Sequence, residues 1–219
     1  MSSLAHEASY SKRKSVLSAY TKLVSQAYPY DWFLTLTVGQ STKQYPKRSA
    51  RLTIGQESFE RWLKRFFRDH VYRRARNCLS WSRRDLAKCS SYVDPVYVMG
   101  FERQRNGRLH AHVLVWFPVF ETIPRYAEIR DFWSEHVGYA WVEHPRSMDK
   151  VCRYVSKYSL KGDNCRGDYE ANLIFSETFG RSCERVTIPR LVGLEVLLGS
   201  RRAGGVTVTR DRARSVATC

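Results

Sequence analysis

Two histidines separated by one residue, His110 and His112, lie in a run of apolar and β-branched residues from Leu109 to Val115. Such a run is typical of a buried strand, in which residues i and i+2 point to the same face. The two imidazoles therefore lie side by side on one sheet surface. Because imidazole nitrogen is a common metal ligand, this spacing predicts a metal-binding position on the sheet.

The turn before this strand decides which side chain faces His110. A strand is expected at 95–103, and the Arg-Asn-Gly segment 105–107 is a strong hairpin signal. A two-residue turn would place Arg103 opposite His110, whereas a three-residue loop with its glycine in the left-handed region would place Glu102 there. The second geometry gives two imidazoles and a carboxylate, which suit Mn²⁺ or Mg²⁺. Glu102 could equally be an exposed carboxylate that balances the neighbouring arginines.

Paired tyrosines and lysines follow at helical spacing. A helix is expected over 149–160, and Tyr154 and Tyr158 lie four residues apart along one edge of its apolar stripe. Lys157 and Lys161 form the next row outward, each three residues after a tyrosine. The ordinary interpretation is an amphipathic helix with tyrosines at its rim and solvated lysines beyond them.

Together, the two patterns indicate phosphodiester chemistry. A metal ion can polarise a phosphate and hold it in line, while nearby lysines favour the phenolate of an attacking tyrosine. The product would be a covalent 5′-phosphotyrosyl DNA and a free 3′-hydroxyl. Two tyrosines on one face would allow two successive strand transfers without release of the DNA.

The charge of the chain points to a polyanionic partner. The 219 residues carry a formal net charge of +16, more than solubility requires, and nucleic acid is the simplest partner. No apolar run reaches transmembrane length and the N-terminus lacks an apolar signal region, so we expect no membrane partner and a cytoplasmic location. The six cysteines form no C-x-x-C pair, which argues against a zinc knuckle and for free thiols.

The remaining segments supply the elements that must position these side chains. Helical patterns occupy residues 5–26, a stretch from a possible cap at Ser58 through Phe67, and a stretch from Pro124 to Gly138. Strand patterns occupy 32–38, 95–103, 109–117 and 139–143. Residues 73–92 and 169–198 show no clear pattern.

This order of elements predicts an α+β domain with a mostly antiparallel sheet of four to five strands and helices packed on it. In the first strand, Phe33, Thr35 and Thr37 share one face and the residues from Trp32 to Val38 that alternate with them share the other. We expect an N-terminal helix at 1–28, the main domain at 29–198 and a basic, flexible tail at 199–219.

Three segments resemble, in the same order, the motifs of the HUH endonucleases, and within them the two-tyrosine rolling-circle replication initiator (Rep) proteins of phages and plasmids. Residues 33–37 resemble the first strand motif, 109–112 the metal motif and 154–158 the paired-tyrosine helix. The resemblance covers residues 30–162. It implies a ferredoxin-like or RRM-like sheet, dependence on a divalent metal, and site-specific nicking of single-stranded or hairpin origin DNA.

The resemblance also implies roles for individual residues. The family often supplies a further acidic metal ligand at the position of Glu102. In two-tyrosine members the first tyrosine commonly starts the reaction, which would make Tyr154 the first nucleophile and Tyr158 the second.

Other interpretations stay open. Relaxases usually carry the tyrosine before the histidines and often a third histidine, whereas here both tyrosines follow two histidines. A single-strand-specific transposase with one tyrosine is a nearer rival. A non-catalytic RRM-like nucleic-acid-binding module would explain the charge and the aromatic residues but would leave the two motifs to coincidence. The chain has no G-x-x-x-x-G-K-[ST] phosphate loop, so a separate helicase and polymerase are expected partners.

Overall fold

A five-stranded sheet in the order β4-β1-β3-β2-β5 forms the centre of the molecule, and every neighbouring pair of strands is antiparallel. The computed structural model describes residues 2–39, 56–89, 92–104, 108–160, 173–180 and 185. Its strands are β1 (Trp32–Val38), β2 (Val96–Arg103), β3 (Leu109–Trp116), β4 (Gly138–Glu143) and β5 (Leu173–Phe175). This arrangement confirms the α+β class, the antiparallel sheet and the expected number of strands.

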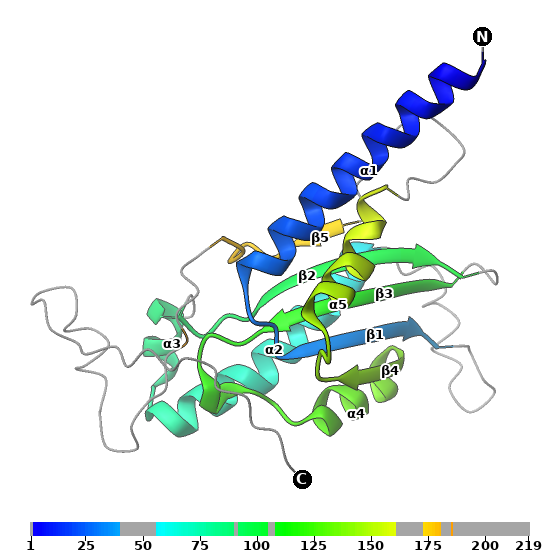
Figure 1. Ribbon diagram of the computed structural model, residues 1–219. Helices are drawn as coiled ribbons and strands as arrows, with labels where there is room; N and C mark the ends of the chain where they lie inside the picture. The colour runs from blue at the N-terminus through cyan, green and yellow to red at the C-terminus, as the bar shows by residue number, and fades with distance from the viewer. Residues whose placement is uncertain are drawn as a thin grey trace, which may run out of the picture.

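Helices cover both faces of the sheet. They are α1 (Ser2–Ala27), α2 (Gln56–Leu79), α3 (Arg83–Cys89), α4 (Tyr126–His136) and α5 (Met148–Ser156), with short 3-10 turns η3 (Phe120–Thr122) and η4 (Lys157–Leu160). Figure 1 shows α1 and α5 together on one face, with α2 and α4 on the other. None of the described helices is both long enough and apolar enough to cross a bilayer.

Strict alternation in the strands builds a separate core on each face. Leu34, Val113 and Ala140 point toward α2 and α4, where they join Phe59, Phe66 and Trp133 in the larger core. Phe33, Leu114 and Val98 point the other way and pack with Val24 of α1 and with Cys152 and Val155 of α5. The two periods, 2.0 in the strands and 3.6 in the helices, therefore meet in two continuous apolar layers.

The register across the sheet arranges the second face in rows. One row runs Trp141–Thr35–His112–Gly100–Leu173 from β4 to β5, and the next runs Tyr139–Thr37–His110–Glu102 from β4 to β2. Residues directly opposite each other in neighbouring strands share a face. Each histidine therefore has a threonine of β1 on one side and a residue of β2 on the other.

The hairpin between β2 and β3 has the longer of the two loops considered. Glu102 pairs with His110, Arg103 with Leu109, and the amide of Gln104 donates to the carbonyl of Arg108 at 2.9 Å. This register leaves three residues in the loop and confirms that Glu102, and not Arg103, faces His110. The loop residues 105–107 lie outside the described residues, as do Lys161 and the segment 199–219.

Three elements differ from the sequence expectations. Helix α2 begins at Gln56 and continues to Leu79, so Ser58 lies inside the helix and does not cap it. Buried Val71 and Ala75 extend its apolar stripe through a stretch whose arginines hide the pattern. Strand β5 was not predicted, because three residues are too few for a periodic signal.

The third difference concerns the tyrosine helix. The expected helix over 149–160 is α-helical only to Ser156, and Lys157 to Leu160 form the tighter 3-10 turn η4. A 3-10 turn advances about 120° per residue instead of 100°. Tyr158 consequently turns inward and is completely buried, and it does not lie at the rim of the helix.

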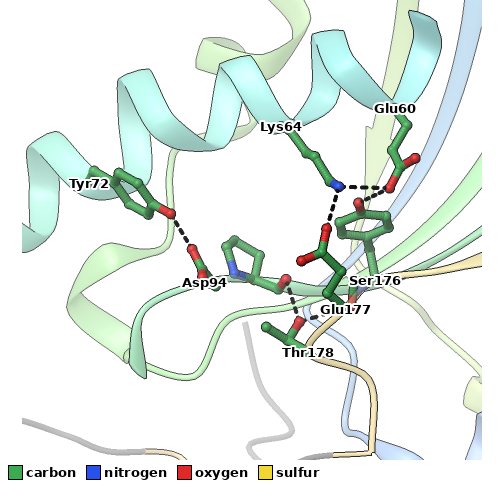
Figure 2. A network of polar contacts seen from close by, with 9 residues as sticks. Glu60, Lys64, Tyr72, Asp94, Ser176, Glu177 and Thr178 are labelled. Carbon is green, nitrogen blue, oxygen red and sulfur yellow. Dashed lines mark hydrogen bonds and ion pairs between the residues drawn. The ribbon is translucent and has the colours of Figure 1, made fainter. Parts of the chain in front are cut away.

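Polar contacts fasten the short strand β5 and the turn after it to the rest of the fold (Figure 2). Lys64 of α2 pairs with Glu60 at 3.2 Å and with Glu177 at 3.0 Å. The hydroxyl of Thr178 donates to the carbonyl of Pro95 at 3.2 Å. These contacts hold the sheet edge next to Gly100 in place.

Candidate active site

The two histidines of β3 are oriented by threonines of β1. The Nδ1 atom of His112 lies 3.1 Å from the hydroxyl of Thr35, and Nδ1 of His110 lies 2.7 Å from the hydroxyl of Thr37. The two ring centroids are 4.5 Å apart. Because each Nδ1 has a hydroxyl partner, each Nε2 atom is left to act on the site, which is the arrangement that supporting hydrogen bonds give metal-binding histidines.

His112 lies inside an aromatic cage. Its ring stacks on Tyr158 with centroids 5.5 Å apart and on Phe33 with centroids 5.8 Å apart, and it is only 5% exposed. Tyr154 meets the same ring edge-on at 4.7 Å. This packing fixes the imidazole in one orientation, which leaves its Nε2 directed toward the hydroxyl of Tyr154 at 3.2 Å.

The two tyrosines lie in different environments. Tyr154 is 39% exposed, whereas Tyr158 is fully buried between the sheet and α5. Burial raises the pKa of the Tyr158 hydroxyl well above its usual value, and its hydrogen bonding with Tyr154 and Glu102 raises that pKa further. Tyr154 therefore presents its hydroxyl to solvent and to His112, and Tyr158 presents its hydroxyl to the interior.

Lys157 brings positive charge to both rings. Its ammonium nitrogen lies 3.5 Å from the ring centroid of Tyr154 and 4.8 Å from that of Tyr158. A cation on the face of an aromatic ring interacts with the π-electrons and stays close to any charge that develops on the phenol oxygen. The structure thus brings Lys157 to the tyrosines, as the spacing predicts.

The carboxylate of Glu102 lies on the same row as His110 and influences both it and Tyr158. Burial lowers the pKa of His110 below its ordinary 6.5, the charge of Glu102 opposes this, and the charge of Lys157 adds to it. The described part of the chain contains no three His, Cys, Asp or Glu side chains close enough together to form a metal-binding group. Glu102 thus faces the histidine pair without closing a three-ligand cluster with it.

Gly100 is a component of the site that sequence reasoning missed. It pairs with His112 on β2, and a Cβ atom on it would lie 2.5 Å from Cδ2 of Tyr158. Only a residue without a side chain leaves room for the tyrosine ring here. The available signal was a glycine in the middle of the expected strand 95–103, a position that often marks the close approach of another group.

A large cavity on the opposite face of the sheet is separate from this site. It measures about 650 Å³ and is lined by α2 and by the turn after β5. Its lysine is paired with Glu60 and Glu177, and its Arg65 and Arg68 are paired with Asp69 (Figure 2 draws the lysine pairs). Because these cations are balanced and the cavity faces away from His110, we do not assign it to the chemistry of the site.

Comparison with known proteins agrees with the motifs. The family model for the replication-associated protein ORF2 matches residues 31–163, more than half of the chain. No curated protein and no solved structure gives a significant match. The matched segment runs from the start of β1 to just beyond η4 and so contains every site residue described above. It supports a Rep-type replication initiator and a role in DNA replication. The chain belongs to this family of replication-associated proteins.

Proposed function

We propose that this protein is an HUH-type, two-tyrosine initiator of rolling-circle replication that nicks single-stranded or hairpin origin DNA through a covalent 5′-phosphotyrosine intermediate. One observation carries the proposal. The exposed hydroxyl of Tyr154 lies 3.2 Å from Nε2 of His112, beside a second histidine on the same sheet face. A nucleophile, two imidazoles and a lysine ammonium thus meet at one accessible position in a basic chain of net charge +16.

The residues present fit a divalent cation, Mn²⁺ or Mg²⁺. His110 and His112 would hold it through Nε2, because the threonine hydroxyls engage Nδ1 of both rings. Glu102 would add an oxygen ligand by a change of rotamer from the row that it shares with His110. When bound, such an ion polarises a phosphate oxygen and orients the phosphodiester.

Tyr154 is the first nucleophile in this proposal. Its oxygen forms a bond to phosphorus while the bond from phosphorus to the 3′-oxygen breaks, and the proton lost by the phenol is balanced by the proton gained by the leaving 3′-hydroxyl. Lys157 stabilises the negative charge on the phenol oxygen from its place over the ring. The energy of the broken phosphodiester is retained in the tyrosyl ester, so the strand can later be rejoined.

Tyr158 is the second nucleophile and takes over the strand in a later transfer. It shares the stacked histidine with Tyr154, and the two ring centroids are 5.9 Å apart, so a phosphate held beside one tyrosine is close to the other. Lys161 would supply a further positive charge to this second step. The protein would recruit a separate helicase and polymerase to extend the free 3′-end.

The test is the capture of DNA by the protein. The full chain is incubated with single-stranded origin oligonucleotides labelled at the 3′-end and Mn²⁺, and adducts are separated on a denaturing gel. Tyr154→Phe is expected to abolish the first adduct, Tyr158→Phe to retain it but lose strand transfer, and the exposed Tyr92→Phe to change neither.

The competing functions give different results in the same assay. A single-tyrosine transposase would keep both adduct formation and strand transfer in Tyr158→Phe. A binding module would bind the oligonucleotide without forming an adduct in any variant, and the nicking function would then be wrong.

A further inference from the structure

Two large aromatic side chains are exposed on the edge strand β4. Tyr139 is 56% exposed and Trp141 is 54% exposed, whereas Ala140 between them is buried against α4. Alternate residues of a strand share a face, so Tyr139 and Trp141 project from the same side of the sheet. A neighbouring pair of exposed aromatic residues is uncommon on a soluble domain and typically marks a binding surface.

The register places this pair in the rows of the active site. Tyr139 lies opposite Thr37, which lies opposite His110, and Trp141 lies in the same way beyond Thr35 and His112. Two strand spacings of about 4.8 Å put the aromatic pair roughly 10 Å from the histidines. Stacked nucleotides of one strand rise about 3.4 Å each, so this separation corresponds to about three nucleotides.

The helices leave this part of the face open. The core beneath α1 and α5 includes side chains of β1, β2, β3 and β5, and none of β4. Figure 1 shows β4 at the sheet edge, with α4 on its other side. The aromatic pair is thus continuous with the exposed side of Tyr154 and is not needed to complete either core.

We propose that Tyr139 and Trp141 form a stacking platform for unpaired bases of the DNA strand that flank the cleaved bond. This inference rests on the proposed function, because it gives that site its substrate form. Aromatic side chains stack on the faces of unpaired bases, and a positively charged protein attracts the backbone that carries them. In a duplex, those faces already stack on one another, so the platform selects single strands.

Tryptophan fluorescence offers a direct test. All six tryptophans lie in the described residues, and Trp141 is the only one of them that is exposed. Titration with oligothymidylate in the absence of metal is expected to quench the emission, and a duplex of equal length to quench it far less. Trp141→Leu should remove the quenching. Equal quenching by duplex and single strand, or unchanged quenching in Trp141→Leu, would overturn the proposal.

Affinity for labelled oligothymidylate tests the contribution of the pair. Tyr139→Ala and Trp141→Ala are each expected to weaken binding about 5-fold or more, since stacking on one base contributes at least that much. Tyr139→Phe and Trp141→Phe should keep the affinity. The exposed aromatics Tyr92 and Phe120, which lie outside these rows, serve as alanine controls and should have no effect.

The salt dependence separates stacking from a phosphate contact. Loss of a phosphate contact lowers the slope of log affinity against log salt, whereas loss of stacking leaves that slope unchanged. A Tyr139→Ala/Trp141→Ala variant that binds oligothymidylate normally would overturn the platform. So would a protein dimer that disappears in the variant while its DNA affinity stays normal.

These outcomes are independent of the nicking proposal. Binding is measured without metal and does not depend on a nucleophile. Loss of affinity in the platform variant together with normal adduct formation by Tyr154→Phe would retain the platform and reject the nucleophile.

Discussion

The Cβ position of Gly100 points into the ring of Tyr158, where a methyl group would lie 2.5 Å from Cδ2 and 3.0 Å from Cγ. Real Cβ atoms do not approach a ring carbon so closely, so a side chain at this position and the buried tyrosine exclude each other. The contact joins the middle of β2 to η4 and sets where the second tyrosine lies.

Gly100→Ala is therefore expected to destabilise the protein by about 1–3 kcal/mol, the usual cost of overpacking a core. In a Tyr158→Ala background the same change should cost much less, because the ring that it meets is gone. Urea unfolding of the four proteins in this double-mutant cycle measures the coupling. Additive effects would show that Gly100 acts on stability without Tyr158.

The threonines of β1 are expected to control metal affinity. Thr35→Val and Thr37→Val keep the shape of the side chain but remove the hydroxyl that contacts Nδ1 of each histidine. Loss of such an orienting partner typically weakens metal binding about 10–100-fold. Calorimetric titration with Mn²⁺ measures the change. Thr21→Val, which loses a hydrogen bond to Leu17 within α1, is the matched control and should leave Mn²⁺ affinity unchanged.

His110 should titrate below 6.5 in the metal-free protein, because burial lowers its pKa. The unfolded chain takes up this proton near its ordinary value, so it binds more protons than the folded chain between 6.5 and the folded pKa. Folding stability is thus full above pH 6.5 and falls as the pH drops through this window. Imidazole resonances followed by NMR give the midpoint, and a midpoint above 6.5 would contradict the structure.

The two described free thiols should differ in reactivity. Cys78 is exposed, whereas Cys152 is buried beneath α5 and burial raises the pKa of its thiol to about 12. The thiolate is the reactive form, so a maleimide should modify Cys78 much faster than Cys152 in the native protein. Peptide mass spectrometry after short exposure quantifies both. Similar rates in native and unfolded protein at Cys152 would show that α5 opens readily.

Local patterns predicted the histidine side of the site well. The i, i+2 rule places His110 and His112 on one face, and the hairpin parity correctly links a three-residue loop to the pairing of Glu102 with His110. Both inferences involve residues close in sequence, where strand geometry alone decides which side chains meet. The alternation within β1 is confirmed for the same reason.

Contacts between distant segments were beyond such reasoning. Nothing in the spacing of Tyr154 and Tyr158 shows that the helix tightens at Lys157, because the change depends on a slot that Gly100 leaves in another strand. The rows that join Trp141 to the histidines likewise depend on the pairing of β4 with β1, which no local period encodes. Tertiary packing, more than propensity, decided these positions.

The 3-10 turn that buries Tyr158 gives the proposed reaction a built-in delay. A rotamer flip in an exposed side chain takes picoseconds to nanoseconds, but local unfolding of a packed turn takes microseconds to seconds. Tyr158 can reach a phosphate only after η4 loosens from Gly100 and His112. The interval between first cleavage and second transfer would then be timed by this opening and would be independent of the intrinsic reactivity of the phenol.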